Sequence, residues 1–212
     1  MGIGIVTGTP DEATCGTMVE ASPPPATGPA NGGARVSVIT LIGGLANLAV
    51  SGLRPVLAEV ALSAFTAPPW NETPAQARQL ADRMLADAQR PGFALALAFT
   101  CGGMRLVGFG YGLPRCPAPD SAMGTLPFAS SAGTEPFEFC ELAVTPDARG
   151  IGVGRALHDT VLAASNPQPR WLVTHPAAHP AVRLYQTSGW QITRVFPSST
   201  NGSSRLLMTR YR

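Results

Sequence analysis

The chain has 212 residues and a mass of 22.0 kDa, is 45% hydrophobic and 13% charged, and has a formal net charge of +2. These values are typical of one compact domain rather than a disordered chain, and they give no reason to expect nucleic acid or a membrane surface as a partner. All 15 basic residues are arginine, which excludes both a Schiff-base lysine and a lysine-containing phosphate loop.

The cysteines and the N-terminal residues indicate a cytoplasmic protein without a metal site. The spacing of the four cysteines resembles no zinc site, and the chain is too large for a disulfide scaffold. The first residues lack the basic and apolar regions of a signal peptide. The apolar stretch 36–53 is interrupted by glycine and is marginal in length for crossing a bilayer, so we expect no membrane span.

Residues 1–34 are rich in proline and glycine and predict a flexible arm, followed by one folded domain over 35–212. Within that domain, the β-branched run 36–42 predicts a strand. A helix is expected over 45–65, with Pro55 as a potential break. Thr73 and Pro74 then open a second helix, which Pro91 and Gly92 end.

The rest of the chain alternates between strands and helices. A hairpin is expected over 93–111, followed by a long loop over 113–135. After it we expect a strand at 137–144, a helix at 153–164, a strand at 171–174, a helix at 180–188 closed by Gly189, and paired strands at 191–195 and 204–208. This order predicts the α/β class, as an α+β layer sandwich.

The segment with the clearest chemistry is the glycine-rich turn between the strand at 137–144 and the next helix. Its glycines are Gly150, Gly152 and Gly154. Such a turn lets a ligand approach the backbone, and the free amides and positive dipole end of the helix favour a pyrophosphate. The spacing does not fit the dinucleotide pattern GxGxxG, so an NAD- or nucleotide-binding module is disfavoured.

Two motifs here resemble those of the GNAT superfamily of acetyl-CoA-dependent N-acetyltransferases. The first is Arg149-x-x-Gly152-x-Gly154, preceded by Leu142-Ala143-Val144 and Pro146. The second is Leu184-Tyr185 followed by Gly189-Trp190, with Ala181 four residues before the tyrosine. One position departs from the family, which often has asparagine where this chain has Ala178. The resemblance covers the chain from about residue 36 to its end and implies a mixed, mostly antiparallel sheet flanked by helices.

The resemblance also implies roles for particular residues. The backbone from Gly150 to Gly154, together with Arg155, would bind the pyrophosphate of acetyl-CoA, the co-substrate, and Arg149 would add charge. Leu142 and Val144 would offer backbone groups to the pantetheine, and the Val144 amide would polarise the thioester carbonyl. Tyr185 would protonate the departing thiolate. The full set implied to bind acetyl-CoA is Leu142, Ala143, Val144, Arg149, Gly150, Ile151, Gly152, Val153, Gly154 and Arg155, with no metal.

The general base stays open between Glu138 and Glu141. Both lie on one strand, and because successive side chains of a strand alternate between its faces, we expect only one of them to point into the site. If water carries the proton, as in many relatives, neither does. Each glutamate could instead be a solvated or structural residue without a catalytic role. In the same way, Tyr185 could be a packed tyrosine at a helix end, and His158 is expected to be a surface or packing residue.

The acceptor is expected to be a primary amine on a small molecule or a protein, and a homodimer is a possible assembly. The sequence shows no evident acidic cluster in the acceptor groove, which gives a polycationic acceptor little support. A different class of function remains open: a GNAT-fold protein that binds acyl-CoA, or a partner, without turnover.

Overall fold

A computed structural model describes residues 36–100, 105–117, 126, 135–165, 169–198 and 202–211. The predicted arm over 1–34 and most of the predicted loop over 113–135 lie outside these residues. Every strand and helix predicted from the sequence is present, with ends that differ by a few residues.

The described strands form one seven-stranded sheet in the order β1-β2-β3-β4-β5-β7-β6. Neighbouring strands are antiparallel except β4 and β5, which are parallel. This confirms the predicted mixed, mostly antiparallel sheet. The strand bounds are β1 Val36–Ile42, β2 Ala94–Thr100, β3 Leu106–Pro114, β4 Phe137–Val144, β5 Arg170–Thr174, β6 Gln191–Pro197 and β7 Ser204–Arg210.

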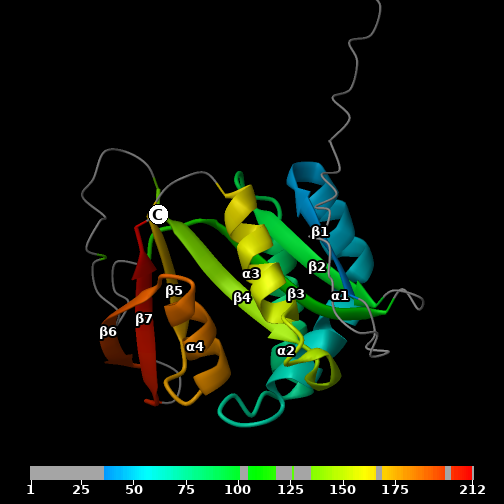
Figure 1. The fold of residues 1–212 in the computed structure, drawn as a ribbon. Helices are drawn as coiled ribbons and strands as arrows, with labels where there is room; N and C mark the ends of the chain where they lie inside the picture. The colour runs from blue at the N-terminus through cyan, green and yellow to red at the C-terminus, as the bar shows by residue number, and fades with distance from the viewer. Residues whose placement is uncertain are drawn as a thin grey trace, which may run out of the picture.

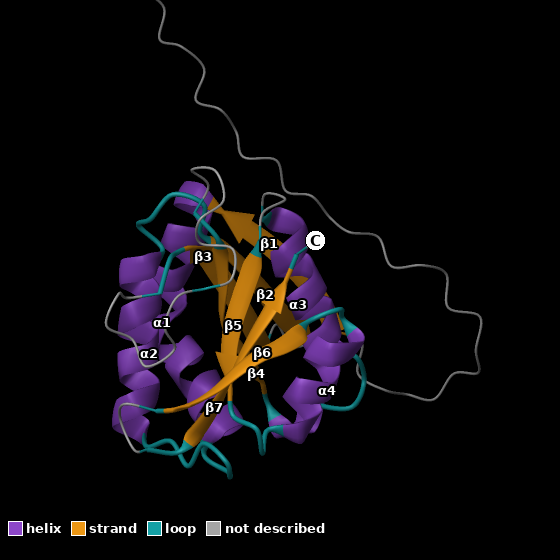
Figure 2. Ribbon diagram, turned by 90° about the vertical axis from the view of Figure 1, so that its left-hand side faces the viewer, coloured by secondary structure: helices purple, strands orange, loops and turns teal. Residues whose placement is uncertain are grey.

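Helices cover both faces of the sheet, which gives the layered arrangement in Figure 2. Helices α1 (Gly43–Phe65) and α2 (Pro74–Asp87) lie on one face, and α3 (Val153–Ala164) and α4 (His179–Thr187) on the other. Each face has its own apolar core, because β-strand side chains point alternately to the two sides. A short 3-10 turn at Pro146–Ala148 leads from β4 toward α3.

Helix α1 runs without a break through Pro55, against the expectation that proline would break or restart it. Proline removes one backbone donor, which would otherwise bond to the carbonyl four residues earlier. Pro55 and Ser51 are both exposed. The Ser51 carbonyl, which lacks its usual hydrogen bond, therefore faces solvent and can accept a hydrogen bond from water. The helix also begins at Gly43, two residues earlier than predicted.

By length and composition alone, helix α1 could cross a membrane, with a mean hydropathy of 1.5 over its most apolar window. It is the one such helix among the described residues. Seven of its residues are buried against the domain, and 28% of that window is buried. These residues are Ala46, Val50, Leu57, Val60, Ala61, Ala64 and Phe65.

Candidate active site

The candidate site begins where strands β4 and β5 separate. Their ladder contains two residue pairs, Phe137 with Arg170 and Glu138 with Trp171, and the strands then diverge toward their C-terminal ends (Figure 1). The Thr145 amide donates to the Val107 carbonyl of β3 at 2.9 Å. Because backbone groups alternate along a strand, the preceding Val144 amide points away from β3, toward the side where the β5 ladder has ended.

The glycine turn lies directly after this end of β4. Gly150 and Gly152 have φ angles of 78° and 91°, and a Cβ on either would meet no heavy atom within 4 Å. The first backbone bond of α3 joins the Ala156 amide to the Gly152 carbonyl at 3.0 Å. The three amides before it, at 153–155, therefore have no partner within the helix. Open space over free amides fits the phosphates of a nucleotide-linked thiol ester.

The two arginines of the turn have structural hydrogen bonds. Arg149 donates from Nε to the Val144 carbonyl at 3.0 Å and from Nη2 to the Ala64 carbonyl at 2.8 Å. It thus connects the turn to the end of α1. Arg155 donates to the hydroxyl oxygens of Thr187 and Ser188 at 2.6 and 3.1 Å, which joins α3 to the end of α4. Both residues remain exposed at the mouth of the turn, where their charge acts on an anion.

A β-bulge in β4 corrects our expectation for the two glutamates. In the pairing with β3, Tyr111 faces Glu141 and Gly112 faces Phe139, so Cys140 is the extra residue. Because of this extra residue, Glu138 and Glu141 both lie on the α2 face of the sheet rather than on opposite faces. The sequence expectation that the two glutamates lie on opposite faces of the strand was therefore wrong.

Glu141 has the geometry and the electrostatics of a general base. Its Oε1 lies 2.5 Å from Nη2 of Arg83 on α2, and 22% of its side chain is exposed. Burial raises the pKa of Glu141 to about 7, although Arg83 opposes the rise, and the charges of Glu72 and Glu138 raise it further. A base whose pKa lies near neutrality is suited to accept a proton and release it again.

Glu138, in contrast, belongs to an ion-pair network at the start of β4. Its Oε2 lies 3.1 Å from Nη1 of Arg115 without the alignment of a hydrogen bond, so the contact is mainly electrostatic. Arg115 also pairs with the buried Asp87 at the end of α2. Burial raises the pKa of Glu138, and Arg115 opposes that rise. The Glu138 carboxylate therefore pairs with Arg115, whereas Glu141 pairs with Arg83.

Tyr185 lies on α4 in an aromatic cluster on the opposite face of the sheet. It is 6% exposed, and its ring packs against those of Phe139, His158 and Trp190 at centroid distances of 6.2, 6.0 and 6.2 Å. Burial and, to a lesser extent, the charge of Glu141 raise the pKa of the Tyr185 hydroxyl well above its usual value. The hydroxyl is therefore protonated at neutral pH and can act as a proton donor. Ala178, where the family often has asparagine, is buried at the start of this helix.

His158 is a packing residue, which resolves one of the readings left open by the sequence. It is fully buried, and its Nε2 accepts a hydrogen bond from Trp190 Nε1 at 2.9 Å. Nδ1 is therefore the protonated nitrogen, and it donates to Asp159 at 2.7 Å. Burial lowers the pKa of His158 below its ordinary 6.5. A second proton would fall on Nε2 and abolish the bond from Trp190.

We expect this histidine to make the fold acid-sensitive. Because the folded pKa lies below the unfolded value, the stabilisation is present above pH 6.5 and is lost as the pH falls toward the folded pKa. One such group changes the free energy of unfolding by at most about 1.4 kcal/mol per pH unit. Urea denaturation at pH 7.5 and 5.5 should show a larger loss for the wild type than for His158→Gln, which does not titrate. Equal losses in both proteins would contradict this account.

The structure brings together an acidic cluster that the sequence did not reveal. Glu72, Asp87, Glu138 and Glu141 gather on the α2 face from three separate elements, with the guanidinium groups of Arg83 and Arg115 between them. If all six ionise, the cluster has a net charge of −2. The α2 face of the sheet therefore has an acidic cluster that was not evident in the sequence. Glu72 and Asp87 lie far from Glu138 and Glu141 in the chain, so no sequence signal links them to the two glutamates of β4.

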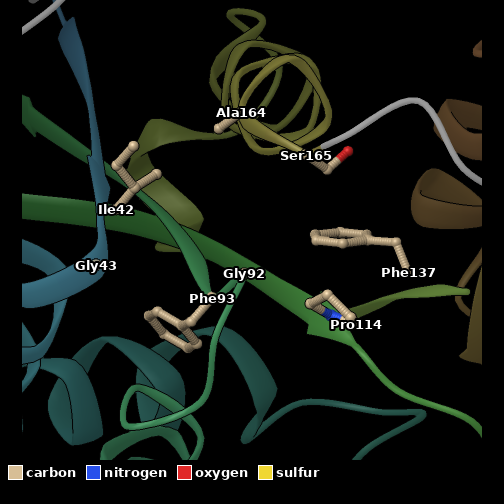
Figure 3. A pocket seen from close by; sticks show the side chains of 8 residues that line it. All are labelled: Ile42, Gly43, Gly92, Phe93, Pro114, Phe137, Ala164 and Ser165. Atoms are coloured by element: carbon tan, nitrogen blue, oxygen red, sulfur yellow. The ribbon is translucent and has the colours of Figure 1, made fainter. Parts of the chain in front are cut away.

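A pocket of about 260 Å³ lies at the other end of α3, away from the glycine turn (Figure 3). Its wall comes from β1, β3, β4 and the last residues of α3, and contains the side chains of Phe93, Pro114 and Phe137. None of its lining side chains is charged. It has no group that could perform acid–base chemistry, so we place the candidate site at the glycine turn instead.

Potential metal ligands do not assemble in the described part of the chain, where no group of three or more His, Cys, Asp or Glu residues could hold an ion. His175 and His179 are four residues apart in the sequence but do not lie on one helix. His179 opens α4, whereas His175 lies in the preceding turn, and its Nδ1 accepts a hydrogen bond from the Ala177 amide at 3.0 Å.

Comparison with known proteins gives the family. The model of the acetyltransferase (GNAT) family matches residues 61–190, more than half of the chain. No protein of curated function matches the sequence. The fold is similar to that of a protein from Desulfovibrio desulfuricans assigned to the GNAT family of acetyltransferases, with 18% identity, a TM-score of 0.52, and coverage of 82% of this chain and 98% of that one.

Two further solved structures have a similar fold. The ribosomal-protein-S18-alanine N-acetyltransferase from Escherichia coli is 14% identical, with a TM-score of 0.53 and coverage of 83% of this chain and 93% of that one. NAA60 from Arabidopsis thaliana, solved with a bisubstrate analogue, is 16% identical, with a TM-score of 0.54 and coverage of 82% and 98%. At these identities the similarity shows the fold alone.

Proposed function

Because the chain belongs to the GNAT family of acetyltransferases, we propose that it transfers an acetyl group from acetyl-CoA to a primary amine by direct attack. The observation that carries this proposal is the opening between β4 and β5, with a free backbone amide at its edge and the glycine turn at its end. A pantetheine arm can lie along β4 there while its pyrophosphate binds at the start of α3. The fold and composition suit a cytoplasmic enzyme.

Each residue in the proposed reaction has one task. The amides at 153–155 bind the pyrophosphate, with Arg149 and Arg155 adding positive charge. The Val144 amide donates to the acyl oxygen as negative charge develops on it. Glu141 takes the proton of the incoming amine, and Tyr185 gives a proton to the sulfur that leaves. Acetyl-CoA supplies the activated acetyl group.

The proposal is tested by titrating the protein with acetyl-CoA in a calorimeter and then assaying thiol release with a panel of primary amines. We expect micromolar binding and turnover. We expect Tyr185→Phe to lower kcat about 100-fold or more without changing acetyl-CoA affinity, because general acid catalysis contributes about 100- to 10,000-fold. Absence of acetyl-CoA binding would overturn the proposal. Tight binding with no thiol release for any amine would favour the acyl-CoA-binding alternative.

A further inference from the structure

The carboxylate of Glu72 has no role in the reaction proposed above. It lies in the loop that joins α1 to α2. Its Oε2 is buried and accepts no hydrogen bond from the described residues. A buried carboxylate oxygen without a donor costs free energy, which a ligand with N–H groups would recover. Burial also raises the pKa of Glu72, and Arg83 opposes that rise.

The loop around Glu72 is fixed by contacts with α1 and α2 at its two ends and with the segment after β5. The Glu72 amide donates to the Phe65 carbonyl at 3.0 Å, and Thr73 and Gln76 form a capping box that starts α2. Trp70 packs edge-on against Phe65 of α1 and against His175 after β5, at 5.8 and 5.9 Å. The loop therefore extends from α1 to the segment that follows β5, across the opening between β4 and β5. Its anchoring places Glu72 before any ligand binds.

Glu72 and Glu141 share a single positive partner. Arg83 lies 2.5 Å from Glu141, and its charge also acts on Glu72, while the charge of Glu72 acts on Glu141. With both carboxylates ionised, these three groups have a net charge of −1. One additional cation beside Glu72 would balance the charge next to the proposed base.

We propose that Glu72 binds the acceptor as its ammonium ion, and that the acceptors are aliphatic primary amines, which are positively charged at neutral pH. This inference rests on the proposed acetyl transfer. An ammonium group has three N–H donors, enough for both Glu72 and Glu141. Glu141 takes one proton from the ammonium nitrogen, so that an N–H bond breaks and an O–H bond forms. The neutral amine then attacks the thioester carbon, a C–N bond forms and the C–S bond breaks. Tyr185 protonates the leaving sulfur, and the second proton lost by the nitrogen passes through solvent to the Tyr185 oxygen. The amide product is uncharged, so its attraction to Glu72 is lost and its release is favoured.

Binding without turnover provides the first test. Protein labelled with [δ-13C]glutamate is titrated with n-butylammonium chloride, with and without CoA, and Glu72→Gln identifies the Glu72 carboxyl resonance. We expect saturable shifts of the Glu72 and Glu141 resonances, no saturable shift with butan-1-ol, and at least tenfold weaker ammonium binding in Glu72→Gln. Glu59→Gln, which removes the same charge from an exposed position of α1, should bind as the wild type does. A Glu72 resonance that does not respond, or equal affinity in both variants, would overturn the inference.

The second test separates binding from catalysis. With benzylamine, a cation at pH 7, Glu72→Gln should raise KM at least tenfold with little change in kcat or in acetyl-CoA affinity, and Glu72→Asp should restore part of the loss. With aniline, which is neutral at pH 7, the substitution should change KM little. A purely structural Glu72 would instead lower the melting temperature and affect both amines equally. Failure of the proposed function is seen separately, as loss of acetyl-CoA binding by the wild type.

Discussion

Replacing Glu141 by glutamine should lower kcat by about two to four orders of magnitude, the range that a well-placed general base contributes. The acceptor reaches the site as an ammonium ion and must lose a proton before its nitrogen can attack. With a pKa of about 7, Glu141 is ionised in a growing fraction of molecules as the pH rises. We therefore expect the wild-type rate to rise with pH through about 7, and this rise should disappear in Glu141→Gln.

The variant should fold, which keeps the test interpretable. A carboxyl whose pKa is higher in the folded than in the unfolded protein destabilises the fold once it ionises, so removing that charge at pH 8 carries no penalty of its own. Arg83 would lose its partner, but 53% of its side chain is exposed and can be hydrated. Glu138→Gln is the matched control on the same strand. A larger kcat loss in that control than in Glu141→Gln would assign the base to Glu138.

Much of the fold could be predicted because its signals are local. Thr73 caps α2 and Pro74 is its first residue, as the sequence predicts, and Thr73 also forms a capping box with Gln76. Gly189 adopts a φ of 84° after α4, the left-handed conformation that ends many helices. Strand ends were less accurate: β6 and β7 each extend two residues beyond the predicted range. Pairing with a neighbour, rather than local residue preference, determines where such strands stop.

The two main errors at the site arise from contacts between distant residues. The bulge at Cys140 has neither glycine nor proline to mark it, and it follows from the pairing of β4 with β3. Without it, strict alternation placed Glu138 and Glu141 on opposite faces. Glu72 precedes Glu141 by many residues, and only the packing of α2 on the sheet brings their charges together. Motifs identified the glycine turn, whereas the acidic groups needed tertiary structure.

The glycine turn supports the second large prediction, which concerns Gly152. With a φ of 91° and open space where a Cβ would be, this position faces the proposed phosphate site. Gly152→Asp and Gly152→Asn differ by one negative charge at nearly equal size, and both residues tolerate a left-handed backbone better than most. We expect Gly152→Asp to bind acetyl-CoA at least 100-fold more weakly than the wild type, about 2.7 kcal/mol, and Gly152→Asn to lose considerably less.

The difference between these two variants isolates charge repulsion from steric effects. Calorimetric titration gives both affinities, and S-acetylpantetheine, which has no phosphate, should bind both variants equally. The wild-type affinity for acetyl-CoA should also fall with salt more steeply than that of Gly152→Asp, because exposed phosphate contacts are screened. Equal acetyl-CoA affinities for the aspartate and asparagine variants would mean that the phosphates do not lie over the start of α3. The glycines would then serve only the sharp connection from β4 to this helix.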